Sequence, residues 1–385
     1  MVGLELLVCA CIFAAVGLHP FITYPLSLAV LARFRPRVLA APATAAAKAR
    51  VALCVCAYNE EKVIRAKAEN MLSMRTAVPG LELLIYVDAA SDRTADILSE
   101  YMGEITVIVS SARHGKTCGM NTLVQTSNAE FIVFSDANVI FAPDAIPRLL
   151  ARFVDPDVGC VCGHLVYTLA DSSATAVTGS FYWRLEEAIK ELETRSGSTM
   201  GADGSIFAIR RALHRPPPPD IIDDMYVSLS VLCDGHRIVR ANDAFAFEEA
   251  TTKAGDEFRR KVRIACQAFN VHRLLRSRLA KLPLLDRYKY ASHKLLRWFA
   301  VYLLTAAGLC LMAGLVAIGA WLLLLIVVSA GVALLAAARF SPTGPPGKIV
   351  DIIAAFIATG LGILQSLRGK RFQVWTPPAS ARVGS

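Results

Sequence analysis

The sequence lacks two signatures that would identify a phosphate or metal site at once. It has no glycine-rich loop of the dinucleotide-binding or Walker type, so if the chain binds a nucleotide phosphate, a metal ion and Lys or Arg side chains must neutralise it. It also has no Cys-x-x-Cys pair among its ten cysteines, which argues against a zinc site. The pairs Cys54/Cys56 and Cys160/Cys162 alternate within apolar runs, as small buried residues do, and we expect reduced thiols in the cytoplasm.

The amino terminus lacks the basic residues that open a secretory signal peptide. Its apolar span, Leu4 to Leu31, contains Glu5, and the small-residue stretch that begins at Ala40 lies too far on for cleavage. The span is long enough to cross a hydrocarbon core of ~30 Å as a helix. We interpret it as a membrane anchor.

Apolar residues make up 55% of the 385, above the usual fraction of roughly 45–50%, and the excess lies at the two ends. Two more spans, about 295–317 and 319–339, predict transmembrane helices. The last apolar stretch, 349–367, contains Asp351 and Gln365 and has its large apolar residues broadly on one side. We favour an interfacial helix there, with the tail in the cytoplasm.

The formal net charge of +9 is concentrated in one basic block. From Asp256 to Arg297 there are twelve Lys or Arg against three acids, and Arg33, Arg35 and Arg37 follow the first span. By the positive-inside rule the region between these flanks is cytoplasmic, which predicts a multi-pass protein of the inner (plasma) membrane. The expected parts are an N-terminal anchor (1–37), a cytoplasmic catalytic domain (45–255), basic interfacial helices (256–294), two transmembrane helices (295–340), and an interfacial or third membrane helix with a basic tail (341–385).

Strand-like and helical segments alternate in the middle region. We therefore expect an α/β fold with a doubly wound, mostly parallel sheet, inserted between the N-terminal and C-terminal membrane helices. Polar residues follow three strands, at Glu60, Asp88 and Asp136, and the carboxyl ends of parallel strands share the crevice where open sheets bind ligands. The runs that predict strands are 51–57, 81–87, 105–109, 131–135 and 158–162.

The run that ends the fourth strand is the strongest candidate for a cation site. Asp136 offers a carboxylate and Asn138 an amide oxygen. Mg²⁺ or Mn²⁺ accepts one or two such ligands and completes its shell with phosphate oxygens and water. For this run alone, an Asp that caps a turn is the alternative.

Together these motifs resemble the family 2 glycosyltransferases, the inverting enzymes of the A-type nucleotide-sugar fold (GT-A), over roughly residues 50–300. The resemblance implies that Asp136 and Asn138 bind the metal, although Asn138 stands where the family has a second acid. Asp88 would contact the base, although Ala89 and Arg93 replace both glycines of the family's Asp-Gly-Ser-Thr-Asp-Gly-Thr turn. The donor-binding residues implied are Tyr58, Glu60, Asp88, Lys116 and Asp136.

The carboxylate pair Asp223-Asp224 follows a run of four prolines. Adjacent acids at a helix start are commonly caps and dipole partners. The resemblance instead implies the family's Glu-Asp motif, with Asp224 as the catalytic base and Asp223 in support. A base that removes the acceptor proton contributes roughly 10²–10⁴-fold to the rate.

A glycine-containing loop is implied to lie beside the acceptor, formed by Gly201, Asp203 and Gly204. The preceding helix carries Trp183, for which ordinary packing is the alternative to acceptor binding. The polymer-forming members of the family carry Gln-x-x-Arg-Trp near the basic block, and this chain does not. We expect Arg260 or Arg263 to serve the diphosphate instead, although a helix on anionic lipid would explain the same charges.

The leading hypothesis is a membrane-bound inverting glycosyltransferase that moves a hexosyl or N-acetylhexosaminyl group. The donor would be a nucleotide-diphosphate sugar, with a UDP-sugar expected, and the cofactor Mg²⁺ or Mn²⁺. The acceptor would be a saccharide or lipid-linked molecule in exopolysaccharide, capsule or glycolipid assembly. Two alternatives stay open: sugar transfer to polyprenyl phosphate, and a non-catalytic membrane protein that binds sugar nucleotides. Membrane lipid is an expected partner and nucleic acid is not.

Overall fold

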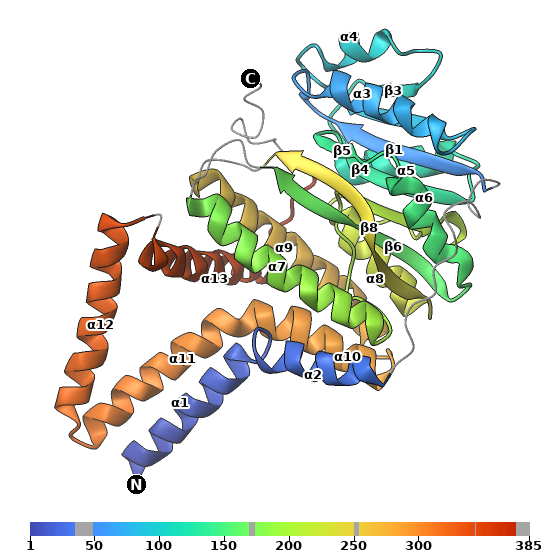
Figure 1. Ribbon diagram of the computed structural model, residues 1–385. Coiled ribbons are helices and arrows are strands. Elements are labelled where there is room, and N and C mark those ends of the chain that lie inside the picture. The colour runs from blue at the N-terminus through green and yellow to red at the C-terminus, as the bar shows by residue number, and fades with distance from the viewer. Residues whose placement is uncertain (35–48, 169–173, 250–253, 343, 375–385) are drawn as a thin grey trace.

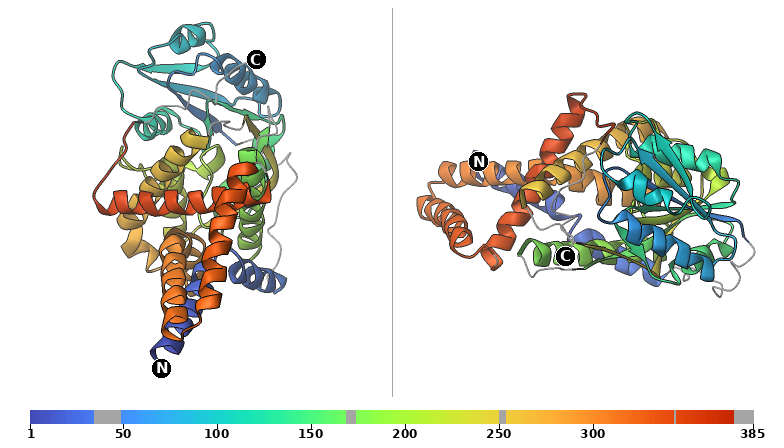
Figure 2. Two further views of the ribbon diagram at one scale, coloured as in Figure 1. Left: turned by 90° about the vertical axis from the view of Figure 1, so that its left-hand side faces the viewer. Right: turned by 90° about the horizontal axis from the view of Figure 1, so that it is seen from above.

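The apolar runs of the middle region form one eight-stranded sheet at one end of an elongated molecule, and long apolar helices form the other end (Figures 1 and 2). This arrangement is that of a computed structural model. It describes residues 1–34, 49–168, 174–249, 254–342 and 344–374, without the side chains of 174–183, 254 and 256.

The strand order is β3-β2-β1-β4-β7-β6-β8-β5. Strands β3, β2, β1 and β4 are parallel, whereas β7 is antiparallel to both β4 and β6, and β5 is antiparallel to β8. The α/β sheet is confirmed, and it is mixed, because β7 and β5 reverse direction. The strands are β1 (Val51–Ala57), β2 (Glu82–Asp88), β3 (Thr106–Ser110), β4 (Phe131–Asp136), β5 (Val139–Phe141), β6 (Val158–Thr168), β7 (Ile206–Arg210) and β8 (Arg237–Glu249).

Helices cover both faces of the sheet and create two core layers. On β1, Leu53 and Val55 join the layer beneath α3, α4 and α6, whereas Cys54 and Cys56 join the layer beneath α5, α8 and α9. All seven residues of β1 are buried, as expected for a central strand with both faces covered. The ten cysteines, all among the described residues, are free thiols, as predicted. The helices of these layers are α3 (Ile64–Ser73), α4 (Thr94–Ser99), α5 (Lys116–Thr126), α6 (Ala145–Leu150), α8 (Asp223–Cys233) and α9 (Ala254–Leu279).

The predicted first span is broken into two helices that meet at 53°. Pro20 lies in the break, where a ring without an N–H cannot continue the helical hydrogen bonds. The first of the two helices packs along α11, and a Cβ at Gly314 would lie 2.9 Å from Leu7. The helices of this end are α1 (Val2–Leu18), α2 (Thr23–Arg33), α7 (Ala174–Arg195), α10 (Leu284–Tyr290), α11 (Leu296–Ala317), α12 (Trp321–Phe340) and α13 (Pro345–Leu367).

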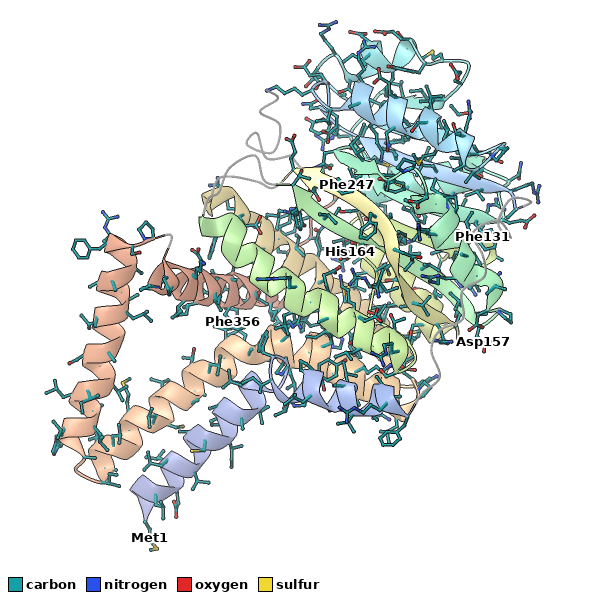
Figure 3. All side chains as sticks on the ribbon, viewed as in Figure 1. Met1, Phe131, Asp157, His164, Phe247 and Phe356 are labelled. Atoms are coloured by element: carbon teal, nitrogen blue, oxygen red, sulfur yellow. The ribbon has the colours of Figure 1, made fainter. Side chains whose placement is uncertain are left out.

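Three described helices are long and apolar enough to cross a membrane, namely Leu284–Ala317, Trp321–Phe340 and Pro345–Leu367, and the bent pair α1–α2 can be a fourth. The last of them packs on α9, since a Cβ at Gly362 would meet the backbone of that helix at 2.5 Å. On the same helix Phe356 packs edge-on against Phe21 in the bend between α1 and α2, with ring centroids 5.3 Å apart (Figure 3).

Candidate active site

The end of β4 presents Asp136 to a lysine at the start of α5. The carboxylate Oδ1 lies 2.6 Å from Lys116 Nζ, and the other oxygen accepts a 3.4 Å hydrogen bond from Ser205. The Asp136 side chain is 33% exposed, so it is accessible to a ligand. The fourth predicted strand therefore places this carboxylate at the edge where a nucleotide diphosphate would lie.

Asp88, at the end of β2, holds the loop that leads into α5. Its carboxylate accepts hydrogen bonds from the backbone N–H of His114 (2.7 Å) and Gly115 (3.0 Å) and from Arg113 Nε (3.0 Å). The side chain is fully buried, so a contact between Asp88 and the nucleotide base stays a prediction. Nearby, the Arg113 guanidinium stacks 3.2 Å from the centre of the Tyr58 ring.

Glu60 connects the loop after β1 with the turn after β2 by a hydrogen bond. Its backbone N–H donates to Thr94 Oγ1 at 2.8 Å, and its side chain is buried. The turn between β2 and α4 is thus fixed against the loop after β1, even though Ala89 adopts a φ of 50°, a conformation that favours glycine. Asp88 therefore lies at the end of β2 and Asp92 in the turn that follows, although the turn contains no glycine.

The predicted base lies in the first turn of α8. Asp224 Oδ1 accepts the N–H of Met225 at 2.6 Å, and a Cβ at Gly204 would lie 2.8 Å from Asp224 Oδ2. Burial, followed by the charge of Asp223, raises the pKa of Asp224 to about 7, and the Lys116 ammonium opposes this rise. A carboxylate with such a pKa suits general-base catalysis near neutral pH.

Three elements far apart in the chain converge here. Lys116 Nζ lies 3.8 Å from an oxygen of Asp223 as well as 2.6 Å from Asp136. Two consecutive loop residues also connect Asp224 with Asp136. Gly204 packs on Asp224, and Ser205 donates a hydrogen bond to Asp136. The predicted metal carboxylate and the predicted base therefore face one small region.

Two arginines of α9 approach the same region. Arg260 lies close enough to Tyr167, Glu257 and Glu248 that these groups, opposing the effect of burial, raise its pKa. The pKa of Arg263 is lowered by burial and by Arg260, and Asp136 opposes this effect. Arg263 thus lies within electrostatic reach of Asp136, whereas Arg260 lies near Glu248, which accepts a hydrogen bond from Asn138.

Asp136 and Asn138 fit a hard divalent cation whose other ligands are phosphate oxygens and water. In the part of the chain that the structure describes, no group of three or more His, Cys, Asp or Glu forms a preformed metal cage. Asp136 supplies one accessible carboxylate, and Asn138, whose Nδ2 donates to Glu248 at 3.1 Å, directs its amide oxygen elsewhere. Mg²⁺ and Mn²⁺ sites commonly use only one or two protein oxygens beside substrate phosphates.

The loop predicted to lie beside the acceptor is held by a buried lysine and a serine. Asp203 pairs with Lys190 of α7 at 2.5 Å, and Ser228 of α8 accepts the N–H of Ala202 at 3.0 Å. Gly201 adopts a φ of 123°, which a residue with a side chain rarely does. Trp183 lies on α7, but its side chain is outside the described residues and its role stays a prediction.

Comparison with known proteins agrees with this geometry. Residues 52–215 match the model of glycosyl transferase family 2. The chain contains a family 2 glycosyltransferase domain. The match covers the Asp88 turn, Lys116 and the Asp136 run, and it ends before Asp223 and Asp224.

Curated relatives and a solved structure extend the comparison. An N-acetylglucosaminyltransferase of Rhizobium sp. (strain N33) is 24% identical over 60% of this chain and 54% of its own length. The probable glycosyltransferase YdaM of Bacillus subtilis (strain 168) is 31% identical over 38% of this chain and 32% of its own. The chain thus spans about half or less of these relatives.

The solved structure is a mannosyltransferase from Pyrobaculum calidifontis in complex with GDP-Man and Mn²⁺. It superposes with a TM-score of 0.73 at 21% identity, over 95% of this chain and 99% of that one. The likeness is one of fold, and it includes the apolar helices. The family 2 domain and its helices thus form an arrangement already seen in a GT-A protein.

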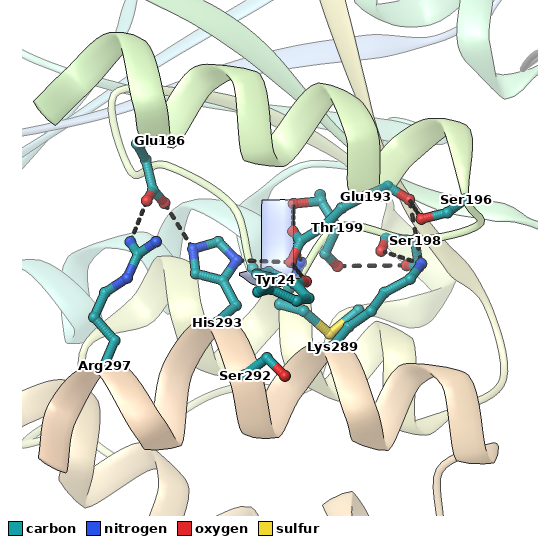
Figure 4. A network of polar contacts seen from close by, with 12 residues as sticks. Tyr24, Glu186, Glu193, Ser196, Ser198, Thr199, Lys289, Ser292, His293 and Arg297 are labelled. Atoms are coloured by element: carbon teal, nitrogen blue, oxygen red, sulfur yellow. Dashed lines mark hydrogen bonds and ion pairs between the residues drawn. The ribbon is translucent and has the colours of Figure 1, made fainter. Parts of the chain in front are cut away.

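A buried polar network connects α7 with α2 and with the helix that continues into α11 (Figure 4). The ring nitrogens of His293 lie 2.7 Å from Glu193 and 3.0 Å from Glu186, both on α7. Tyr24 of α2 also donates to Glu193, and Arg297 pairs with Glu186. The α7 helix, which leads to the acceptor loop, is thereby held by α2 and by the helix that continues into α11.

The chain after α13 returns to the donor side of the domain. Gln373 Nε2 donates to the carbonyl of His114 at 3.3 Å, and the carbonyl of Phe372 accepts from Gln267 at 3.2 Å. A Cβ at Gly115 would lie 2.0 Å from the Gln373 carbonyl oxygen. These contacts were missed in the sequence because no local pattern marks a pairing over such a separation.

Proposed function

We propose that this protein is a membrane-bound inverting glycosyltransferase that uses a nucleotide-diphosphate sugar and Mg²⁺ or Mn²⁺. The single observation that carries the proposal is the placement of Lys116 between Asp136 and Asp223, with Asp224 beside Gly204. The Lys116 ammonium thus lies between Asp136, which we assign to the diphosphate side, and Asp223, which is next to the proposed base Asp224. The family 2 match and the nucleotide sugar and Mn²⁺ named for the P. calidifontis mannosyltransferase support this assignment.

The chain's own residues account for the two halves of an inverting displacement. Asp224 removes the proton of the acceptor hydroxyl as that oxygen attacks C1 of the sugar, and its pKa of about 7 allows it to hold the proton. Lys116, Arg260 and Arg263 stabilise the charge that develops on the departing nucleoside diphosphate. A divalent cation held by Asp136 and Asn138 supplies further charge neutralisation at the diphosphate.

The remaining donor-side residues position the nucleotide in this proposal. Tyr58 and Arg113 offer a stacked pair for the nucleotide, and Glu60 and Asp88 hold the loops that carry them. Gly201, Asp203 and Gly204 line the acceptor side, and Trp183 is assigned there from the resemblance alone. A UDP-sugar is the donor that we expect.

The acceptor is proposed to be a saccharide or a lipid-linked molecule, in exopolysaccharide, capsule or glycolipid assembly. The apolar helices and the fastening of α7 to them support a catalytic domain that works at the cytoplasmic face of the inner membrane. We propose that α13 lies in the interface, since it packs against α9 and its end delivers the tail to the donor loop.

The decisive experiment compares the wild type with Asp224→Asn. Purified full-length protein in detergent is incubated with a panel of nucleotide sugars, and released nucleoside diphosphate and transferred sugar are both measured. We expect the variant to bind nucleotide as the wild type does and to lose at least about a hundredfold in turnover. Asp96→Asn, at an exposed acid on α4, is the control of matched chemistry. Unchanged turnover in Asp224→Asn would remove that residue from the base role.

A second acceptor class, polyprenyl phosphate, is favoured by Lys294. This lysine lies in the π-helical turn Ala291–Leu295, a local distortion that is frequent at functional sites. Its Cε lies 3.9 Å from a Cβ built at Gly201. Among the described residues no atom forms a hydrogen bond or a direct ion pair with its ammonium, although the carboxylates of Glu186 and Glu193 act on it electrostatically. An acceptor phosphate would supply a direct partner.

Lys294→Met separates the two acceptor classes. With a polyprenyl phosphate acceptor, the variant should raise the acceptor KM at least about tenfold, because a charge-assisted contact contributes roughly 1.5–3 kcal/mol. With a neutral saccharide acceptor, the same variant should leave KM near the wild-type value. Solvent extraction of radiolabelled product identifies which acceptor was used.

A further inference from the structure

The pairing of β5 with β8 brings a carboxylate to the metal motif. In this antiparallel pair Val139 stands opposite Glu248, so Glu248 is adjacent in space to the residue before Val139. Glu248 Oε1 accepts a 3.1 Å hydrogen bond from Asn138 Nδ2. Asn138 is the residue that occupies the place of the second acid in the Asp-x-Asp pattern.

This hydrogen bond decides which end of the Asn138 amide is available to a cation. When ionised, the Glu248 carboxylate only accepts hydrogen bonds, so the amide then turns its NH₂ group toward Glu248, as the Nδ2 contact has it. The amide oxygen then points away from Glu248. Because a cation is bound by the oxygen and not by the NH₂ group, the contact with Glu248 selects the ligating orientation.

The backbone around Asn138 is already fixed from the other side. The ammonium of Lys67, a fully buried residue of α3, donates to Ser135 Oγ at 2.7 Å and to the carbonyl of Val139 at 2.6 Å. These two contacts bracket the turn that carries Asp136 and Asn138. The main freedom left at this position is rotation of the Asn138 side chain, which Glu248 restrains.

Glu248 also supplies a charge that the motif lacks. A neutral amide at position 138 leaves Asp136 as the only acid of the run. When ionised, Glu248 adds a second negative charge one hydrogen bond away, beside Arg260, and it comes from a strand 110 residues further along the chain. An outer carboxylate that orients a ligand and strengthens its binding is a recurrent feature of metal sites.

We propose that Glu248 is the positioning residue that completes the divalent-cation site, by holding the Asn138 amide with its oxygen toward the nucleotide diphosphate and by replacing the missing acidic charge. This inference rests on the proposed function, since it assumes that a nucleotide diphosphate and a divalent cation bind at Asp136. Its test uses cation binding, not sugar transfer.

The experiment measures Mn²⁺ affinity of the full-length protein in detergent by electron paramagnetic resonance at pH 8, with UDP or GDP present. We expect Glu248→Gln to weaken Mn²⁺ binding about tenfold or more, within the roughly 10–100-fold range typical of outer carboxylates. The matched control is Glu249→Gln, at the exposed neighbouring residue of β8, which should bind Mn²⁺ as the wild type does.

The double variant Asn138→Asp with Glu248→Gln provides a rescue. It exchanges acid and amide, keeps the net charge of the pair, and preserves the hydrogen bond with its direction reversed. We expect its Mn²⁺ affinity to return to near the wild-type value. This outcome would also show that Glu248→Gln had not simply disturbed folding.

Several outcomes would overturn the inference. One is an unchanged Mn²⁺ affinity in Glu248→Gln, and another is a double variant that binds Mn²⁺ as weakly as the single variant. The third is a wild type that binds no Mn²⁺ in the presence of either UDP or GDP. The fate of the proposed function is separate. A protein with the expected Mn²⁺ results and no sugar transfer would retain the cation site and lose the transferase assignment, whereas normal transfer with unchanged Mn²⁺ affinity in Glu248→Gln would do the reverse.

Discussion

The ammonium of Lys116 lies 2.6 Å from Asp136 Oδ1, where it occupies the carboxylate that is proposed to bind the cation. Burial by itself lowers the pKa of Lys116, but Asp136, Asp223 and Asp224 raise it well above its usual value. The lysine is therefore charged at any pH at which the enzyme would work. Its charge reduces the repulsion among Asp136, Asp223 and Asp224. The same ammonium can bind a diphosphate.

Replacing this lysine by methionine should affect both halves of the reaction. Lys116→Met removes a cation from the diphosphate side, and we expect kcat/KM to fall about a hundredfold or more. It also removes the charge that opposes the raised pKa of Asp224, so the pH below which activity is lost should move upward. Steady-state kinetics from pH 6 to 9 measure both effects. Lys62→Met, at an exposed lysine, is the control, and a profile that keeps its midpoint would contradict the coupling.

The wild-type pH profile is a separate prediction. The base must be ionised to accept a proton, and burial together with Asp223 raises the pKa of Asp224 to about 7. Activity should therefore rise with pH through about 7 and level off above it. An ordinary aspartate would already be ionised near pH 5. A kcat/KM that is constant from pH 5.5 to 8.5 would show that Asp224 is not the titrating base.

Much of the fold was predictable because the decisive segments carry local signals. Strand β1 is apolar at every position, and both of its faces prove to be covered. Helix α8 begins at Asp223, where two acids suit the positive end of a helix. The C-terminal pair α11 and α12 falls close to the predicted spans because length and hydropathy suffice to mark such helices.

The remainder depends on contacts between distant segments. The hydrogen bond from Asn138 to Glu248 requires that β8 pair with β5, and β8 was not predicted from the sequence at all. Likewise, Gln373 reaches the loop before Lys116 only because the chain that follows α13 returns to that loop. The bend in the first apolar span was not predicted either: the helix breaks where Pro20 lies, and Tyr24 of α2 enters a buried network.

The turn after β2 offers a test of backbone strain. Ala89 has a φ of 50°, where a residue with a Cβ pays roughly 1–2 kcal/mol. Glycine avoids that cost but loses about 0.5–1 kcal/mol in chain entropy. We expect Ala89→Gly to raise the free energy of unfolding by up to about 1 kcal/mol, measured by denaturant titration in detergent. Ala90→Gly, next in the chain and without a positive φ, should lower it, and equal shifts in both variants would refute this reading.

The contact between the tail and the donor loop can be tested at Gly115. This glycine has a φ of 89°, and a Cβ there would lie 2.0 Å from the Gln373 carbonyl oxygen. Gly115→Ala should therefore detach the tail as well as strain the loop. Exposed backbone is cleaved faster, so we expect trypsin to cut after Arg371 severalfold faster than in the wild type, and nucleotide affinity to fall.

The matched control is Gly80→Ala, because Gly80 has a similar φ of 79° and no atom within 4 Å of its added Cβ. It introduces comparable backbone strain without touching the tail. Cleavage after Arg371 at wild-type rate in Gly80→Ala, and fast cleavage in Gly115→Ala, would tie the tail to the donor loop. Equal cleavage rates in the two variants would mean that the Gln373 contact does not hold the tail in place, and any loss of nucleotide affinity would then come from strain in the loop that precedes Lys116.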